Sequence, residues 1–232
     1  MDNRFAASTS RAGTMDAGLR AHMSRVYNRM TAGVLVTALV AAFVASSPAL
    51  LQFFLGGPQM YVVIFAPLAI VWFGFNPARM TSQQLMIAFF AIAVLYGISF
   101  SVLGLIFTKA SIARAFFVAT GMFAGLSLYG YTTKKNLDGL GAFAVMGVWG
   151  ILIAAILNMF FHSPVMQNMI AGVGIIAFSA ITAWYTQVTK EMYHAGAGDE
   201  ANSRMVWMAT LNLYIAFVAL FQYIIQFMGQ RQ

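Results

Sequence analysis

The chain has 232 residues, of which 61% are hydrophobic and only 8% are charged, whereas about 25% of the residues in a soluble domain carry charge. This composition excludes an ordinary soluble protein, and the lack of cysteine excludes disulfides, thiolate metal sites and cysteine nucleophiles. The formal net charge of +7 does not indicate a nucleic-acid partner, because the basic residues are spread over loops and termini and do not gather on one face.

The apolar residues occur in runs of about 20, which is the length that an α-helix needs to cross a bilayer. Only helices and closed barrels satisfy their backbone groups in lipid, and a barrel sequence would show short alternating segments. The sequence therefore predicts an all-α, polytopic membrane protein.

The chain begins with residues 1–18, which are small and polar and predict a flexible cytoplasmic tail. Residues 19–232 are predicted to form one transmembrane domain. At its start, apolar residues recur at helical spacing between Leu19 and Met30, with polar residues opposite. This pattern fits a short amphipathic helix on the membrane surface, and it fits equally well a cytoplasmic extension of the first transmembrane helix.

Seven transmembrane helices are predicted after this segment. The stretch 48–58 between the first and second is apolar but too short to cross the membrane, so we expect an interfacial turn of helix there. Gly56, Gly57 and Pro58 should end that turn. The predicted transmembrane helices are residues 30–47, 60–75, 83–107, 111–131, 140–161, 165–188 and 206–228.

The distribution of basic residues predicts the orientation of the chain. Ten Lys and Arg residues fall on the side of the N-terminus and three on the other side. Because basic loops stay in the cytoplasm, the N-terminus is predicted to be cytoplasmic and the C-terminus to be outside.

Charged side chains are absent from the predicted transmembrane helices. None of the six acidic residues lies inside one, and no Lys or Arg lies near the centre of one. Intramembrane charges are the usual sign of proton relays and substrate sites, so a proton-coupled transporter is disfavoured. Ser99 has no base within reach and is not an activated nucleophile. We expect a protein that is not an enzyme, with no catalytic residue, metal ligand or cofactor.

Small and amide side chains remain as candidates for function. Gly121 and Gly125 form a Gly-x-x-x-Gly pair, which is typical of close helix packing within or between subunits. Buried amides in lipid mostly stabilise a bundle, by about 0.6 kcal/mol on average, and lining a path for water or ions is the alternative. The candidates for such a polar lining are Gln187, Asn212, Gln222 and Gln226.

Five ordered segments resemble the Bax inhibitor-1 family in its bacterial, YccA-like form. The family usually reads Ala-Trp-Asp-Thr-Gln in the sixth helix and Leu-Tyr-Leu-Asp-Phe in the seventh. This chain has Tyr185 and Ala216 at the two aspartate positions. The resemblance covers nearly the whole chain, through LRAHMSRVYNRM, SIARAFF, SLYGYTTKK, ITAWYTQ and NLYIAFVALF.

The resemblance implies a location in the bacterial inner membrane and a bundle with the seventh helix at its centre. It also implies a calcium or cation leak gated by a pH-sensitive aspartate pair, or association with the membrane AAA protease FtsH. A carboxylate pair can titrate near neutral pH and supply oxygens to Ca²⁺, whereas Tyr185 and Ala216 cannot do so. Two functions therefore stay open: a cation-leak protein with an altered or closed gate, and a non-enzymatic regulator of FtsH in membrane-protein quality control.

Overall fold

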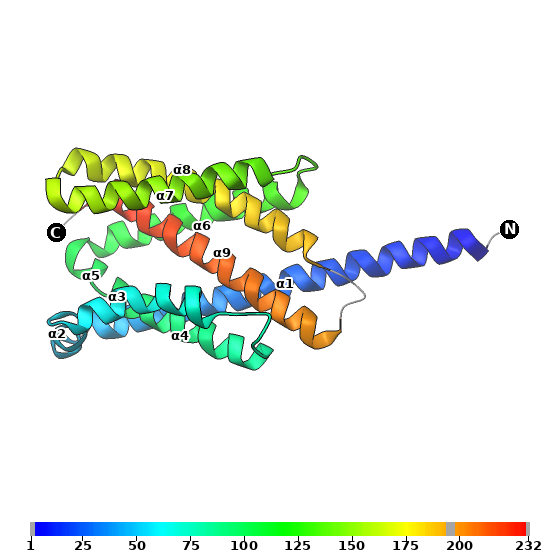
Figure 1. Ribbon diagram of the computed structural model, residues 1–232, viewed down its shortest axis with the longest axis horizontal. Coiled ribbons are helices and arrows are strands. Elements are labelled where there is room, and N and C mark those ends of the chain that lie inside the picture. Colours follow the sequence, from blue (N-terminus) through cyan, green and yellow to red (C-terminus); the bar gives the residue numbers. More distant parts are fainter. Residues whose placement is uncertain (1–2, 194–197, 231–232) are drawn as a thin grey trace.

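The computed structural model describes residues 3–193 and 198–230, which form helices without any strand. The chain runs through α1 (Asn3–Ala45), α2 (Pro48–Leu55), α3 (Gln59–Ala69), the π-helix η1 (Ile70–Gly74) and α4 (Ser82–Phe100). It continues through α5 (Leu103–Ile106), α6 (Lys109–Thr132), α7 (Asp138–Phe161), α8 (Pro164–Glu191) and α9 (Asp199–Met228). The long helices lie roughly parallel and antiparallel to one another in a bundle (Figure 1).

The predicted all-α, polytopic membrane fold is confirmed. Six helices are long and apolar enough to cross a membrane, and the pair formed by α2 with α3–η1, bent by 72°, makes a seventh if it is counted as one crossing. The two ends of the chain lie at opposite ends of the bundle (Figure 1), as an odd number of crossings requires. That the N-terminal end faces the cytoplasm stays a prediction.

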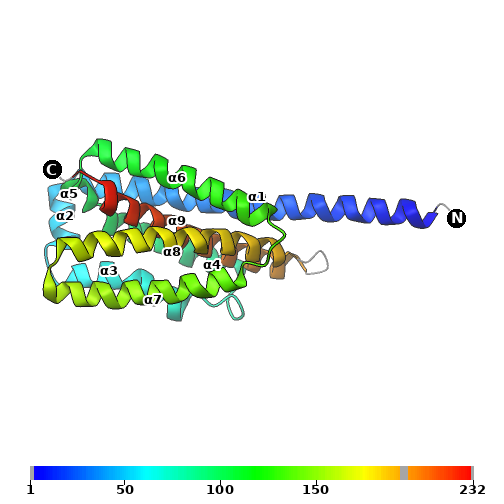
Figure 2. The same cartoon turned by 90° about the horizontal axis from the view of Figure 1, so that it is seen from above.

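Helix α1 continues without a break from Asn3 into the bundle and projects beyond the other helices (Figures 1 and 2). Of the two arrangements that fit the pattern after Leu19, the structure has the extension of the first transmembrane helix. The tail predicted for residues 1–18 is helical from Asn3, and residues 1 and 2 lie outside the described part. The flexibility of this segment stays a prediction.

Two features between α1 and α4 differ in how well the sequence predicts them. The interfacial turn expected at 48–58 is present as α2, which ends at Gly56. The second predicted transmembrane helix is not uniformly α-helical, because η1 follows α3. Pro67 lies inside α3 and has no N–H to donate, so the regular hydrogen-bond ladder is interrupted shortly before the π-helix begins.

Helix α9 forms the centre of the bundle. It packs against α1, α4, α6 and α8, whereas α7 packs on α8 and α3 packs on α4. In its most apolar stretch 67% of the residues are buried, against at most 39% in any other transmembrane helix. Apolarity alone does not explain this burial, because α7 is more apolar than α9 and yet only 17% buried. The predicted central position of the seventh helix agrees with this packing.

Glycines set the closest approaches between helices. A Cβ at Gly130 would overlap the backbone carbonyl of Ala183, so α6 and α8 touch at this point. The predicted packing pair behaves differently: no described atom lies within 4 Å of where a Cβ of Gly121 or Gly125 would be. Within the described ranges these two glycines make no close contact with another helix, and packing between subunits stays a prediction.

We predict that Gly130→Ala destabilises the protein, because a rigid backbone carbonyl opposes the added methyl group. Overpacking of this kind costs about 1–3 kcal/mol. Gly125→Ala, on the same helix but in open space, should leave stability unchanged or raise it by up to about 1 kcal/mol through helix propensity. Thermal unfolding of both variants in the same detergent measures the difference. Equal melting temperatures would contradict the contact.

Candidate functional site

The two positions that carry aspartates in the resembled family come together between α8 and α9. Ala216 of α9 is fully buried in a small cluster with Ala144 of α7 and Ile181 of α8. The half-buried ring of Tyr185 packs against this cluster, and the ring of Trp184 stacks on it with the centroids 4.9 Å apart. In the described part of the chain the Tyr185 hydroxyl makes no hydrogen bond. Tyr185 therefore acts on the cluster through the volume of its ring.

Gln187 lies two residues further along α8 and is buried. Its amide nitrogen donates to the carbonyl of Lys135 at 2.9 Å, and its amide oxygen accepts from the N–H of Leu137 at 2.8 Å. Both halves of the amide thus hold the backbone of the loop between α6 and α7. In the structure this predicted lining residue is a clamp on that loop.

The same face of α8 makes two further contacts with this region. The indole N–H of Trp184 donates to a carboxylate oxygen of Asp138 at 3.0 Å, and the ammonium of Lys190 donates to the carbonyl of Tyr131 at 3.0 Å. Trp184, Gln187 and Lys190 are spaced by three residues and therefore lie on one side of the helix. The motif around Trp184 and the segment Ser127–Lys135 consequently meet in space, which their separation in sequence did not indicate.

The other lining candidates do not join Gln187 in one site. Asn212, Gln222 and Gln226 are half-buried on α9, and their side chains form no hydrogen bond with any residue of the described ranges. Asn212 and Gln226 are about 21 Å apart along the helix axis, at 1.5 Å per residue. A continuous polar lining built from the four amides stays a prediction.

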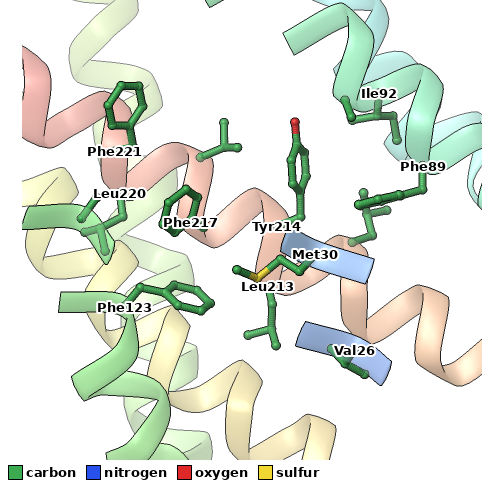
Figure 3. Packing of buried hydrophobic residues seen from close by; sticks show 14 of the residues in the cluster. Val26, Met30, Phe89, Ile92, Phe123, Leu213, Tyr214, Phe217, Leu220 and Phe221 are labelled. Carbon is green, nitrogen blue, oxygen red and sulfur yellow. The ribbon is translucent and has the colours of Figure 1, made fainter. Parts of the chain in front are cut away.

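A buried polar contact that the sequence analysis missed joins three helices. The hydroxyl of Tyr214 lies 2.7 Å from the hydroxyl of Thr37 on α1, and Thr37 also lies 3.0 Å from the carbonyl of Ala93 on α4. Tyr214 is fully buried and extends from α9 between Phe217 and Phe89 (Figure 3). Thr37, a single hydroxyl within the apolar run of the first helix, was the signal for this contact.

Charged groups gather at the end of the bundle nearest the N-terminus. The guanidinium of Arg29 lies 4.1 Å from the centre of the Trp207 ring, which joins α1 to α9. Glu200 at the start of α9 accepts from the backbone N–H and the hydroxyl of Ser82, at 2.7 and 2.8 Å. Over the described ranges, no three His, Asp or Glu side chains come together in a group that could hold a metal ion. The charges in this region therefore serve to join helix ends.

Comparison with known proteins gives matches over nearly the whole chain. The profile of the family described as inhibitor of apoptosis-promoting Bax1 matches residues 19–232. An uncharacterised protein of Rickettsia prowazekii is 37% identical over 226 residues, covering 97% of this chain and 96% of the relative. An uncharacterised protein of Caulobacter vibrioides is 39% identical, covering 93% and 91%. The inner membrane protein YbhL of Escherichia coli is 33% identical, covering 93% and 94%.

We predict that Gln187→Leu frees the loop between α6 and α7, because it removes two hydrogen bonds to the loop backbone. Each hydrogen bond contributes about 0.5–1.5 kcal/mol to the free energy of opening the loop. Loss of both should therefore raise the population of the open loop about tenfold. Cleavage by trypsin after Lys134 or Lys135 measures this opening. Gln222→Leu, which removes an amide that contacts no loop, is the matched control. Equal cleavage rates in the two variants would show that the clamp does not hold the loop.

Proposed function

Because the chain belongs to the Bax inhibitor-1 family of integral membrane proteins, we propose that it is a non-enzymatic relative of cation-leak proteins whose ion path is closed by Tyr185. Its relative in E. coli, YbhL, is an inner membrane protein, which supports the same location for this chain. The observation that carries the proposal is the packing of the Tyr185 ring against the buried cluster of Ala144, Ile181 and Ala216.

The chemistry of this cluster supports a closed path. Ca²⁺ in proteins takes six to eight oxygen ligands, commonly including carboxylates. The side chains of Ala144, Ile181 and Ala216 offer none, and neither Tyr185 nor Ala216 can act as a carboxylate pair that titrates near neutral pH. We therefore expect little ion flux and no steep dependence of flux on pH.

Restoring both acids tests this proposal. The double variant Tyr185→Asp with Ala216→Asp should create a Ca²⁺ flux that changes between about pH 6 and 8, where carboxylate pairs and histidines switch. Each single variant should mainly lower stability, because it buries one unpaired acid in an apolar site. Ca²⁺ uptake by liposomes containing the purified protein is the measurement.

Tyr185→Phe is the matched control, since it keeps the ring and removes a hydroxyl that forms no hydrogen bond within the described residues. This variant should stay as closed as the unmodified protein. A strong pH-gated flux in the unmodified protein would show that the ring does not close the path.

A second function is favoured by the shape of the N-terminal end. Helix α1 projects from the bundle (Figure 2), and this end is predicted to face the cytoplasm. A projecting segment is accessible to a soluble or membrane-anchored partner. We propose as the alternative that the protein is a partner or regulator of a membrane AAA protease such as FtsH.

Deletion of residues 1–18 tests the partner role. The shortened protein should persist longer in cells, because the protease loses the segment by which it would engage the chain. The bundle should nearly keep its melting temperature, since the first part of α1 projects beyond it (Figure 2) and Gly18 contacts Tyr193 at its edge. Pulse-chase measurement of half-life, with cells lacking the protease as the control, gives the answer. An unchanged half-life in protease-containing cells would argue against this segment as the handle.

A further inference from the structure

A groove lies between α1 and α6, with α9 as its floor. Its first part has a volume of about 570 Å³ and is lined near its end by Arg20 and Tyr131. Its second part has a volume of about 650 Å³ and reaches Lys109. Both parts are lined by Val34 of α1, Phe116 of α6 and Phe217 of α9, so they adjoin each other along the side of the bundle.

The groove crosses the thickness of a bilayer. On α1 its lining extends from Arg20 to Ser46, which corresponds to about 39 Å of helix at 1.5 Å per residue. A bilayer with its headgroup regions is about 40–45 Å thick. Arg20 and Lys109 therefore mark the two headgroup levels, and each half of the groove belongs to one leaflet.

The walls of the groove are mostly apolar between its two ends, with a few hydroxyl side chains such as Thr31 and Thr120. In the first half, the rings of Phe123 and Phe217 pack edge to face with centroids 5.5 Å apart, and Met30 lies opposite on α1. These three side chains lie near one another in Figure 3. Each half has a volume within the range of about 300–1,000 Å³ that small-molecule sites occupy.

The surroundings determine what can fill such a groove. Water is disfavoured because the walls offer too few polar partners, and an empty groove would leave the lining atoms without dispersion contacts. The groove opens sideways towards the bilayer, where the available apolar groups are the acyl chains of lipids. An acyl chain in the groove would supply the dispersion contacts that the lining side chains need, without displacing any helix.

The end of the first half carries the groups that would hold a lipid headgroup. Arg20 lines it, and so does Tyr131, whose carbonyl accepts from the ammonium of Lys190 and whose ring centre lies 5.9 Å from that ammonium. Tyr27 also lines this end. Tyrosine rings are typical of the headgroup level, and the Arg20 guanidinium at this end attracts a phosphate.

We propose that the groove between α1 and α6 is a binding site for one anionic phospholipid from the leaflet on the N-terminal side. One acyl chain lies along Phe123 and Phe217, and the phosphate lies at Arg20. A second copy of the protein is the competing occupant. Gly121 and Gly125, the residues suited to helix packing between copies, are not among the lining residues, so a helix packed on them would leave the groove to lipid.

Native mass spectrometry of the full chain in detergent, with added phosphatidylglycerol or phosphatidylcholine, tests the site. We expect phosphatidylglycerol to be retained in preference to phosphatidylcholine. Arg20→Gln should weaken the retention of phosphatidylglycerol about fivefold, the contribution of one basic side chain near an anionic headgroup. Arg25→Gln, which removes a charge from α1 outside the groove lining, should change retention much less.

A second pair of variants tests the location. Ala124→Trp fills the first half of the groove and should abolish retention, whereas Val118→Trp adds the same side chain to an exposed position of α6 outside the lining. Thr120→Phe, at another groove position, replaces Ala124→Trp if that variant does not fold. Equal retention of the two lipids, retention that survives the filled groove, or a dimer that Ala124→Trp dissociates would each overturn the proposal.

Discussion

The burial of α9 is the constraint from which the arrangement of the other helices follows. Its buried residues run from Val206 at one end to Ile225 at the other and cover most of its circumference, while the face that carries Asn212 and Gln222 is only partly buried. Such a helix is stable in the bundle only when neighbours surround it, and α1, α4, α6 and α8 provide that surface. The ring is incomplete where α1 faces α6, and the groove with Phe217 on its floor is the consequence.

Polar side chains in the transmembrane helices are mostly used for holding neighbouring backbone. Thr182, Thr186 and Thr210 each donate to the carbonyl four residues earlier in their own helix. Gln187 reaches further and holds a loop. The segment around Trp184 thus combines two roles, because Trp184, Gln187 and Lys190 tie α8 to α6 and α7 while Tyr185 between them packs towards α9. The segment that resembles the family therefore contains both residues that hold α8 to its neighbours and the residue at the aspartate position.

Hydropathy and spacing were sufficient to predict the helices and the short α2, because those properties depend on length and on the polarity of whole segments. The central place of α9 was expected from the family resemblance alone. Hydropathy and spacing were not sufficient to predict which glycine makes a contact. Gly130 lies against Ala183, whereas Gly121 and Gly125 face open space. All three glycines lie on α6, and the rotation of this helix about its own axis decides which of them faces α8. The contact between Tyr214 and Thr37 joins residues 177 positions apart, so the hydroxyl of Thr37 could signal a polar contact but could not identify its partner. The role of Gln187 was hidden for the same reason.

The segment formed by α3 and η1 has a consequence for the membrane itself. It consists of eleven α-helical residues followed by five in a π-helix, a rise of about 24 Å at α-helical spacing. The hydrocarbon core of a bilayer is about 30 Å thick, so α3 and η1 without α2 are shorter than this layer. If α3 and η1 alone make the crossing, lipids beside Trp72 and Phe73, which are both strongly exposed, must shorten or tilt to meet them. Such a crossing would thin the bilayer on one side of the protein, where hydrophobic mismatch favours lipids with shorter chains.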